Sequence, residues 1–115
     1  DDSIKSRVAR NLNTPADVLE KLSKDKDEWV RKRVAENTRV SEEVLEILGK
    51  DEVEYVRREV ASNPATSQKV LVRLSMDEDK MVRKNVTMNP NALQGTRLMV
   101  RYRDLDVLKR MYDQN

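Results

Sequence analysis

The 115-residue chain has no cysteine, no histidine and no phenylalanine, and it has only two glycines. Without cysteine and histidine it cannot form disulfides, Cys/His zinc sites, iron–sulfur clusters or His-dependent catalytic triads. With glycine only at Gly49 and Gly95 it lacks the glycine-rich phosphate loops of nucleotide-binding folds. No paired carboxylates stand out from the solvated ones, so we expect no cofactor, no metal and no enzymatic activity.

Long apolar runs are also missing, and no segment approaches the roughly 20 apolar residues that a membrane-spanning helix needs. The sequence begins Asp1-Asp2-Ser3, unlike a signal peptide, so we expect a cytoplasmic, soluble protein with no membrane partner. Because Asp1 is not an initiator methionine, we expect the natural chain to start earlier. The charges are balanced, with 23 Lys+Arg against 21 Asp+Glu, which indicates a well-solvated mixed surface.

What the sequence does contain is an internal repeat, because a shift of 26 residues aligns the chain with itself. One position is asparagine in all four aligned segments: Asn11, Asn37, Asn63 and Asn89. The apolar pairs also coincide: Val8-Ala9, Val34-Ala35, Val60-Ala61, and Val86 followed by Thr87. We therefore predict one domain over residues 1–115, built from four units at approximately 4–29, 30–55, 56–81 and 82–115.

Within a unit, the apolar residues have helical spacing on two short segments. Ser41 and Ser67 stand where an N-cap is expected before the second segment. Asn37 and Asn63 follow the first segment and are suited to the left-handed residue that ends a helix. Helices of eight to ten residues do not persist alone, since isolated helices need about 12–15 residues. The units must therefore stabilise one another by stacking.

The repeated strings VRKRVAENTRVSEEVLEILGKD and VRREVASNPATSQKVLVRLSMD resemble the leucine-rich repeat variant family. They are also similar to HEAT repeats, in which an Asp closes one helix and a Val-Arg pair opens the next. The resemblance implies an all-α fold of the ARM type: a right-handed α-solenoid, or superhelix, of short helices. It also implies a binding scaffold.

The last unit departs from the repeat. Thr96 and Arg97 stand where Val and Leu are expected, and a two-residue insertion would place Leu98 and Met99 there instead. We predict such an insertion and a divergent C-terminal cap, and a separate final helix after Arg103 remains an alternative. The first unit shows no matching adaptation. Its exposed end therefore predicts either missing repeats or a weak end-to-end homodimer, with a monomer as the alternative.

An Asp and a basic residue six positions later recur as a linked pair. Phosphate binding would not require the Asp at constant spacing, so we interpret these residues as a structural ladder in which each Arg bridges the Asp of its own unit or of an adjacent one. Its members are Asp25 with Arg31, Asp51 with Arg57, and Asp77 with Arg83.

A second basic row has no acidic residue that repeats with it, and we select it as a candidate binding surface. It consists of Lys32, Arg58 and Lys84. Residues 82–115 carry seven basic and three acidic residues, and the basic ones include Arg97, Arg101 and Arg103. The leading hypothesis is a non-enzymatic scaffold that binds a protein partner through this row and the basic C-terminal segment. The alternative is a nucleic-acid-binding solenoid that uses the same residues.

Overall fold

The computed structural model describes residues 2–113, except for the side chains at positions 2, 107, 108 and 112. Within these residues it contains eight helices and no strand, which confirms the all-α prediction. Four first helices begin 26 residues apart: α1 (Asp2–Arg10), α3 (Glu28–Glu36), α5 (Glu54–Ser62) and α7 (Lys80–Met88). Four second helices have the same spacing: α2 (Ala16–Leu22), α4 (Glu42–Leu48), α6 (Gln68–Leu74) and α8 (Gln94–Asp113).

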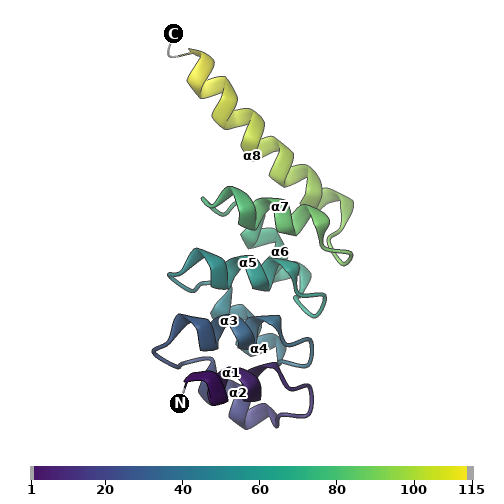
Figure 1. Cartoon of the computed structure of the whole chain (residues 1–115). Coiled ribbons are helices and arrows are strands. Elements are labelled where there is room, and N and C mark those ends of the chain that lie inside the picture. The colour runs from purple at the N-terminus through teal and green to yellow at the C-terminus, as the bar shows by residue number, and fades with distance from the viewer. Residues whose placement is uncertain (1, 114–115) are drawn as a thin grey trace.

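The helices form an elongated stack in two layers (Figure 1). Each first helix packs on the next, α1 on α3, α3 on α5 and α5 on α7, and the second helices lie behind them. The molecule measures 52 × 26 × 17 Å, and α8 projects from the end of the stack opposite α1. Each short helix is therefore stabilised mainly by its neighbours, as its length requires.

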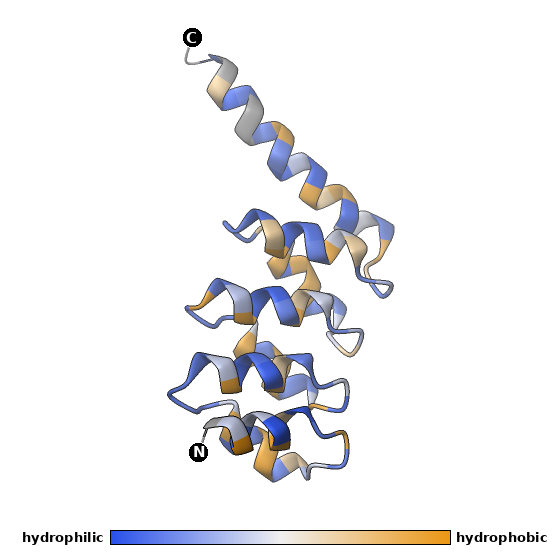
Figure 2. Cartoon of the chain, viewed as in Figure 1, coloured by the Kyte–Doolittle hydropathy of each residue, from blue (hydrophilic) through white to orange (hydrophobic). Residues whose placement is uncertain are grey.

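The core is a single cluster that runs lengthwise through the stack. Its rows are the Val-Ala positions of the first helices and the Val-Leu-Leu positions of the second helices. Along each helix the hydrophobic segments alternate with hydrophilic ones (Figure 2). Leu45, Leu48, Leu71 and Leu74 are all at most 1% exposed, and each contributes about 1.5–3 kcal/mol by its burial.

The expected helix caps are present at the second helices and differ at the first. The Ser41 and Ser67 hydroxyls accept hydrogen bonds from the backbone N–H groups of Val44 and Val70. The left-handed prediction for Asn37 and Asn63 is wrong, because both have extended backbones with φ near −70°. Among the described residues no non-glycine position has positive φ. The side chains of these asparagines instead donate hydrogen bonds to backbone carbonyls of the preceding unit.

The two-residue insertion predicted for the last unit is also wrong. Helix α8 begins at Gln94, 26 residues after the start of α6 at Gln68. Thr96 and Val100 are buried, at 4% and 7% exposure, in the positions that Val70 and Leu74 hold in α6. Leu98 and Met99, which the insertion would have brought inside, are exposed. The stack accepts the smaller residues in the unshifted register.

Helix α8 continues for 20 residues where the other second helices have seven. After α6, the Asp77 carboxylate accepts a hydrogen bond from the Asp79 backbone N–H and forms a tight turn. The corresponding position in α8 is Arg103, which has no acceptor for this bond. The chain therefore continues as one helix, and the alternative of a separate final helix after Arg103 is wrong.

Candidate interaction surface

The linked Asp and basic residues form a continuous ladder of ion pairs along one edge of the stack. In the first three units each basic side chain contacts the carboxylate that follows the second helix of its own unit, and in the last unit the partner lies within α8. The pairs are Lys5–Asp25 at 3.0 Å, Arg31–Asp51 at 2.8 Å, Arg57–Asp77 at 2.8 Å and Arg83–Asp104 at 3.0 Å. The last partner, Asp104, lies one residue beyond the repeat position and had no signal in the repeat.

The same arginines also bind the turn of the preceding unit. Arg31 Nη1 donates to the backbone carbonyl of Asp25 at 2.8 Å, and Arg57 Nη1 donates to that of Asp51 at 2.7 Å. The carboxylate of Asp25 accepts from the Asp27 backbone N–H at 2.9 Å, and this bond together with Lys5 lowers the pKa of Asp25. Each arginine thus joins two successive turns, which is a structural role.

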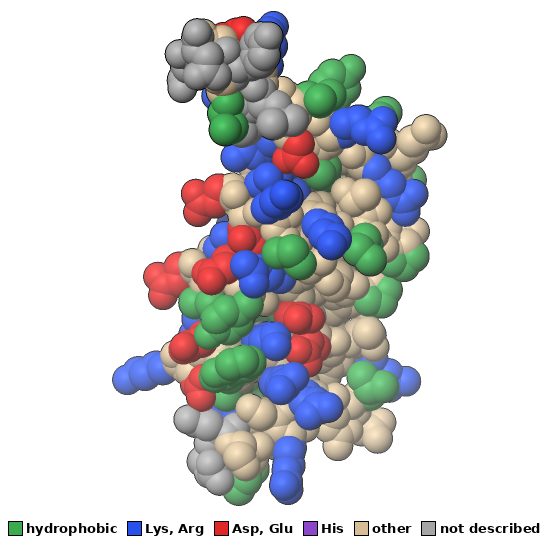
Figure 3. Space-filling model, turned by 45° about the horizontal axis from the view of Figure 1, so that its top comes forward, with side chains coloured by type: hydrophobic (Ala, Val, Ile, Leu, Met, Phe, Trp, Pro, Cys, Tyr) green, Lys and Arg blue, Asp and Glu red, His purple; other side chains and the backbone are tan. Residues whose placement is uncertain are grey.

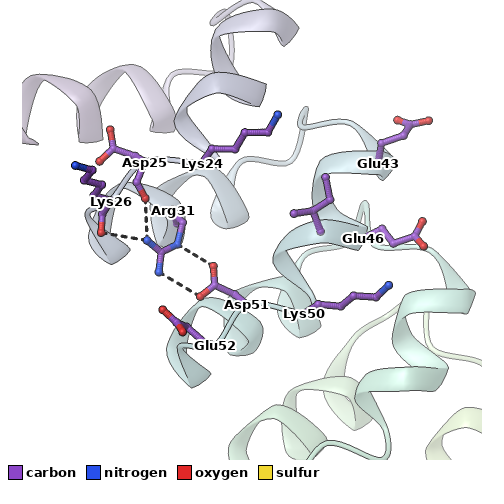
Figure 4. Close-up of a pocket in the computed structure, with 10 residues that line it drawn as sticks. Lys24, Asp25, Lys26, Arg31, Glu43, Glu46, Lys50, Asp51 and Glu52 are labelled. Atoms are coloured by element: carbon purple, nitrogen blue, oxygen red, sulfur yellow. Dashed lines mark hydrogen bonds and ion pairs between the residues drawn. The ribbon is translucent and has the colours of Figure 1, made fainter.

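The ladder borders an open cleft of about 830 Å³ between the turns after α2 and α4. Figure 4 shows Arg31 between Asp25 and Asp51, and the side chains of Lys24, Glu43 and Lys50 directed away from it. The described residues contain no group of three carboxylates that could hold a metal ion. Because the Arg31 guanidinium and the Asp51 carboxylate are already paired with each other, neither is available to bind a ligand in this cleft.

A buried asparagine ladder runs parallel to the ion pairs and was not identified from the sequence. Each asparagine side chain donates two hydrogen bonds to carbonyls of the unit before it. The donor–acceptor distances are 2.7–3.1 Å, and the acceptors are the backbone carbonyls of Ala9 and Asn11 for Asn37, of Ala35 and Asn37 for Asn63, and of Ala61 and Asn63 for Asn89. These bonds satisfy carbonyls that a helix end leaves unpaired. The invariant asparagine in all four segments was the available signal.

The asparagine ladder ends at Arg97, one of the residues selected as basic and exposed. Arg97 Nη2 donates to the Asn89 carbonyl at 3.1 Å, the bond that an asparagine of a further unit would make. Arg103 Nε similarly donates to the Asp77 carbonyl, at 3.4 Å. Of the three basic residues selected in the C-terminal segment, Arg97 and Arg101 are exposed and line a cleft between α7 and α8, and Arg103 is partly buried.

The basic row of Lys32, Arg58 and Lys84 lies on the first helices, and two of its members have acidic partners. Lys32 Nζ is 3.7 Å from Glu36, and Arg58 forms a bidentate pair with Asp79 at 2.8 and 3.1 Å. The Arg58 guanidinium lowers the pKa of Asp79. Lys84 is exposed. The row therefore presents less free positive charge than its sequence indicates.

An aromatic pair, the exposed Trp29 and the partly buried Tyr55, lies beside this row. The Trp29 and Tyr55 rings have centroids 5.4 Å apart, and the Lys32 ammonium lies 4.8 Å from the Trp29 ring centroid. Trp29 is 51% exposed and Met81, at the same position in α7, is 42% exposed. Packing between units accounts for the ring contact but leaves half of the tryptophan in solvent.

Glu59 lies on the same face, in the row next to Arg58. Burial raises its pKa, and the nearby Glu36 carboxylate raises it further. In α7 the corresponding residue is Asn85, whose side chain donates to the Arg58 carbonyl at 3.2 Å. The first-helix face thus mixes both charges with apolar groups, and Figure 3 shows blue, red and green side chains interspersed on it.

Comparison with known proteins gives no match: no family model, curated protein or solved structure resembles this chain significantly. The class of protein is therefore defined by the fold alone, an all-helical stack with helix starts at a constant 26-residue spacing. None of the helices in residues 2–113 combines the length and the apolar character that a membrane crossing requires.

Proposed function

We propose that the chain is a right-handed α-solenoid of four two-helix repeats, related to leucine-rich repeat variant and HEAT-like proteins, with α8 as its C-terminal cap. Three observations support this reading. The helices begin at a constant spacing, the first helices contact one another in order, and two side-chain ladders repeat the same bonds in successive units. A stack of this kind has an extended surface suited to binding.

The proposed function is that of a non-enzymatic scaffold that binds a protein partner through the first-helix face. The observation that carries this proposal is Trp29, which is 51% exposed, stacks on the partly buried Tyr55 and has the Lys32 ammonium over its ring. Tryptophan, tyrosine and arginine are the residues that most often dominate the binding energy of protein interfaces. Half-exposed aromatic rings that are fixed by stacking supply such an anchor with little loss of side-chain entropy.

Nucleic-acid binding is the alternative, supported by the exposed Lys84 and Arg101. It is the weaker candidate because Lys32 and Arg58 would have to leave Glu36 and Asp79 before they could bind phosphate. A partner with both apolar and charged groups fits the same surface without breaking those pairs. The two candidates differ in their response to salt and to nuclease.

The test is capture of proteins from a lysate of the source organism on the immobilised chain, with and without nuclease. Substitution Trp29→Ala should remove the specifically bound protein, whereas Met111→Ala, which truncates an exposed side chain near the end of α8, should not. Binding should survive nuclease treatment and respond only modestly to salt. Loss of the bound protein on nuclease treatment would contradict the proposal. Direct binding to an oligonucleotide would support the alternative if the logarithm of the binding constant falls with the logarithm of the salt concentration, with a slope of about −0.9 per neutralised phosphate.

A further inference from the structure

The second-helix face, which is the opposite side of the stack from Trp29, has its charges separated along the long axis. Helices α2 and α4 carry most of the acidic residues: Asp17, Glu20, Glu42, Glu43 and Glu46. Helix α6 carries no acidic residue, and its basic residues are Lys69 and Arg73. In α8, Arg97 and Arg101 hold the positions of the buried Leu71 and Ser75 and line a cleft with α7, so they lie at the end of the stack and not on this face. Helix α4 is therefore the acidic helix of this face and helix α6 the basic one, and we call the side of α2 and α4 the acidic half and the side of α6 and α8 the basic half.

The basic half also exposes a group of large apolar side chains. Positions that hold Glu20 and Glu46 in α2 and α4 hold Val72 in α6 and Leu98 in α8. The group consists of Val72, Met76, Leu98, Met99 and Tyr102, which are between 37% and 72% exposed. Helices α6 and α8 contact each other, so these side chains lie on adjoining helices. Apolar groups gathered in this way mark an interaction surface, and methionine adapts readily to an occupant.

The acidic half supplies a complementary surface, since Ile47 is 52% exposed on α4 among Glu42, Glu43 and Glu46. Attraction between the two halves is already visible within one chain. Lys69 Nζ on α6 lies 3.3 Å from the Glu46 carboxylate on α4, and Arg73 Nη2 donates to the Glu46 carbonyl at 3.3 Å. Where an acidic and a basic second helix meet, they therefore form ion pairs and hydrogen bonds.

We propose that a second copy of this chain is the occupant of this face. The two stacks run in opposite directions about a two-fold axis that is parallel to the second helices and passes between α4 and α6. In this arrangement α4 of one copy faces α6 of the other, so both central contacts join an acidic helix to a basic one, and α2 faces the exposed apolar side chains of α8. A two-fold axis along the stack would instead place α4 on α4 and acid on acid, which like-charge repulsion disfavours.

The arrangement is isologous and closes at two copies, because each copy contributes the same surface. It leaves the first-helix face, with Trp29 and Tyr55, open to solvent in both copies. The dimer and the proposed protein-binding function are therefore independent, and either can fail without the other. Because the charges involved are exposed, the dimer should weaken as the ionic strength rises.

The experiment is sedimentation equilibrium of the full chain over a range of concentrations at low and high salt. A double reversal on the basic half, Lys69→Glu with Arg73→Glu, should weaken the dimer at least about tenfold, and so should Glu42→Lys with Glu43→Lys on the acidic half. The matched control is Lys80→Glu with Lys84→Glu, the same charge change on α7, which should leave the dimer intact. Circular dichroism verifies that each variant is folded.

The decisive measurement mixes the two reversed variants. An equimolar mixture should form a heterodimer at least about tenfold more stable than either variant's homodimer, since opposite charges again face each other in both α4–α6 contacts, whereas like charges face each other in both contacts of each homodimer. A chain that stays monomeric at every concentration would overturn the proposal. So would a dimer that is insensitive to both reversals but is lost in Ile4→Ser, because that result would place the contact at the exposed end of α1.

Discussion

Helices α6 and α8 begin alike and end differently. Ser75, which follows α6, is fully buried, and Ser23 and Gly49 are buried at the same position after α2 and α4. A Cβ on Gly49 would lie 3.1 Å from a Val70 side-chain carbon and 3.2 Å from the Leu45 carbonyl, so the site accepts only small residues. In α8 this position is Arg101, which cannot enter such a site.

The comparison separates two requirements of a helical stack. Burial at two or three positions is enough to hold a second helix in register, as Thr96 and Val100 do for α8. Ending that helix and returning the chain to the next layer needs a small residue and then an Asp that accepts a backbone hydrogen bond. Helix α8 has the buried positions but lacks the small residue and the Asp. It therefore docks on the stack and then leaves it (Figure 1). The following substitutions test this division.

The largest expected effect is loss of core volume inside the regular layers. Leu45→Ala should lower the free energy of unfolding by about 2–5 kcal/mol, because Leu45 is 1% exposed and the cavity cannot collapse between two fixed layers. Leu105→Ala in α8, where the side chain is 55% exposed, should change it by less than about 0.5 kcal/mol. Urea melts measure both. A comparable loss in the two variants would show that α8 beyond Val100 is part of the core.

The asparagine ladder should give the next largest effect. Asn63→Ala removes the side-chain donors to the Ala35 and Asn37 carbonyls, both of which lie inside the stack. Leaving these groups unsatisfied should cost about 2–3 kcal/mol in urea melts. Asn11→Ala is the matched control at the exposed end of the ladder, and it should cost less than about 1 kcal/mol. Equal costs would mean that the bonds between units add little to stability.

The ion-pair ladder should contribute less, because its side chains are only partly enclosed. Arg57→Ala would leave the Asp77 carboxylate, 11% exposed, without its partner, and should cost about 1–2 kcal/mol. Lys32→Ala should cost less than about 0.5 kcal/mol, since its pair with Glu36 is longer and more exposed. Thermal or urea unfolding of the two variants side by side gives the answer. If the two losses are the same, the ladder has no special role in stability.

The smallest effect concerns Glu59 and its counterpart Asn85. Because the pKa of Glu59 is raised above its ordinary value of 4.5, the folded chain retains this proton at a pH where the unfolded chain has released it. The ionised Glu59 carboxylate therefore lowers the free energy of unfolding at neutral pH, and this loss disappears as the pH falls toward 4.5. Glu59→Gln should stabilise the chain at pH 7 by up to about 0.5 kcal/mol and reduce this pH dependence. A destabilised variant at pH 7 would show that the carboxylate has a favourable partner there.

The sequence was sufficient to predict the all-helical fold and the 26-residue spacing, because buried Val, Ala and Leu recur at fixed positions. It also associated Asp with Arg in a ladder, but it did not decide which Asp each Arg contacts: Arg31 pairs with the Asp51 carboxylate and binds only the backbone carbonyl of Asp25. It failed at Asn37 and Asn63, where a residue suited to a left-handed turn serves instead as a buried side-chain donor across 26 and 28 residues. Local propensity does not reveal a hydrogen bond of that range.

The basic row and the last unit show two further limits. Arg58 pairs with Asp79 at the end of its own unit, but the same position in the unit before is Val53, so no acidic residue appeared to repeat with the row. The insertion was inferred because Thr96 and Arg97 are poor matches to Val and Leu. The structure retains the register with Thr96 buried, and Arg97 donates the last hydrogen bond of the asparagine ladder. A hydrophobic pattern cannot predict that a polar side chain takes over this bond.

Amide hydrogen exchange along α8, followed by NMR, tests the central claim most directly. The account predicts slow exchange in α3, α5 and α7 and in α8 up to Val100, with protection that falls sharply after Leu105, where the helix has left the stack. Uniformly slow exchange from Gln94 to Asp113 would contradict it, because the whole of α8 would then belong to the same cooperative unit as the regular layers.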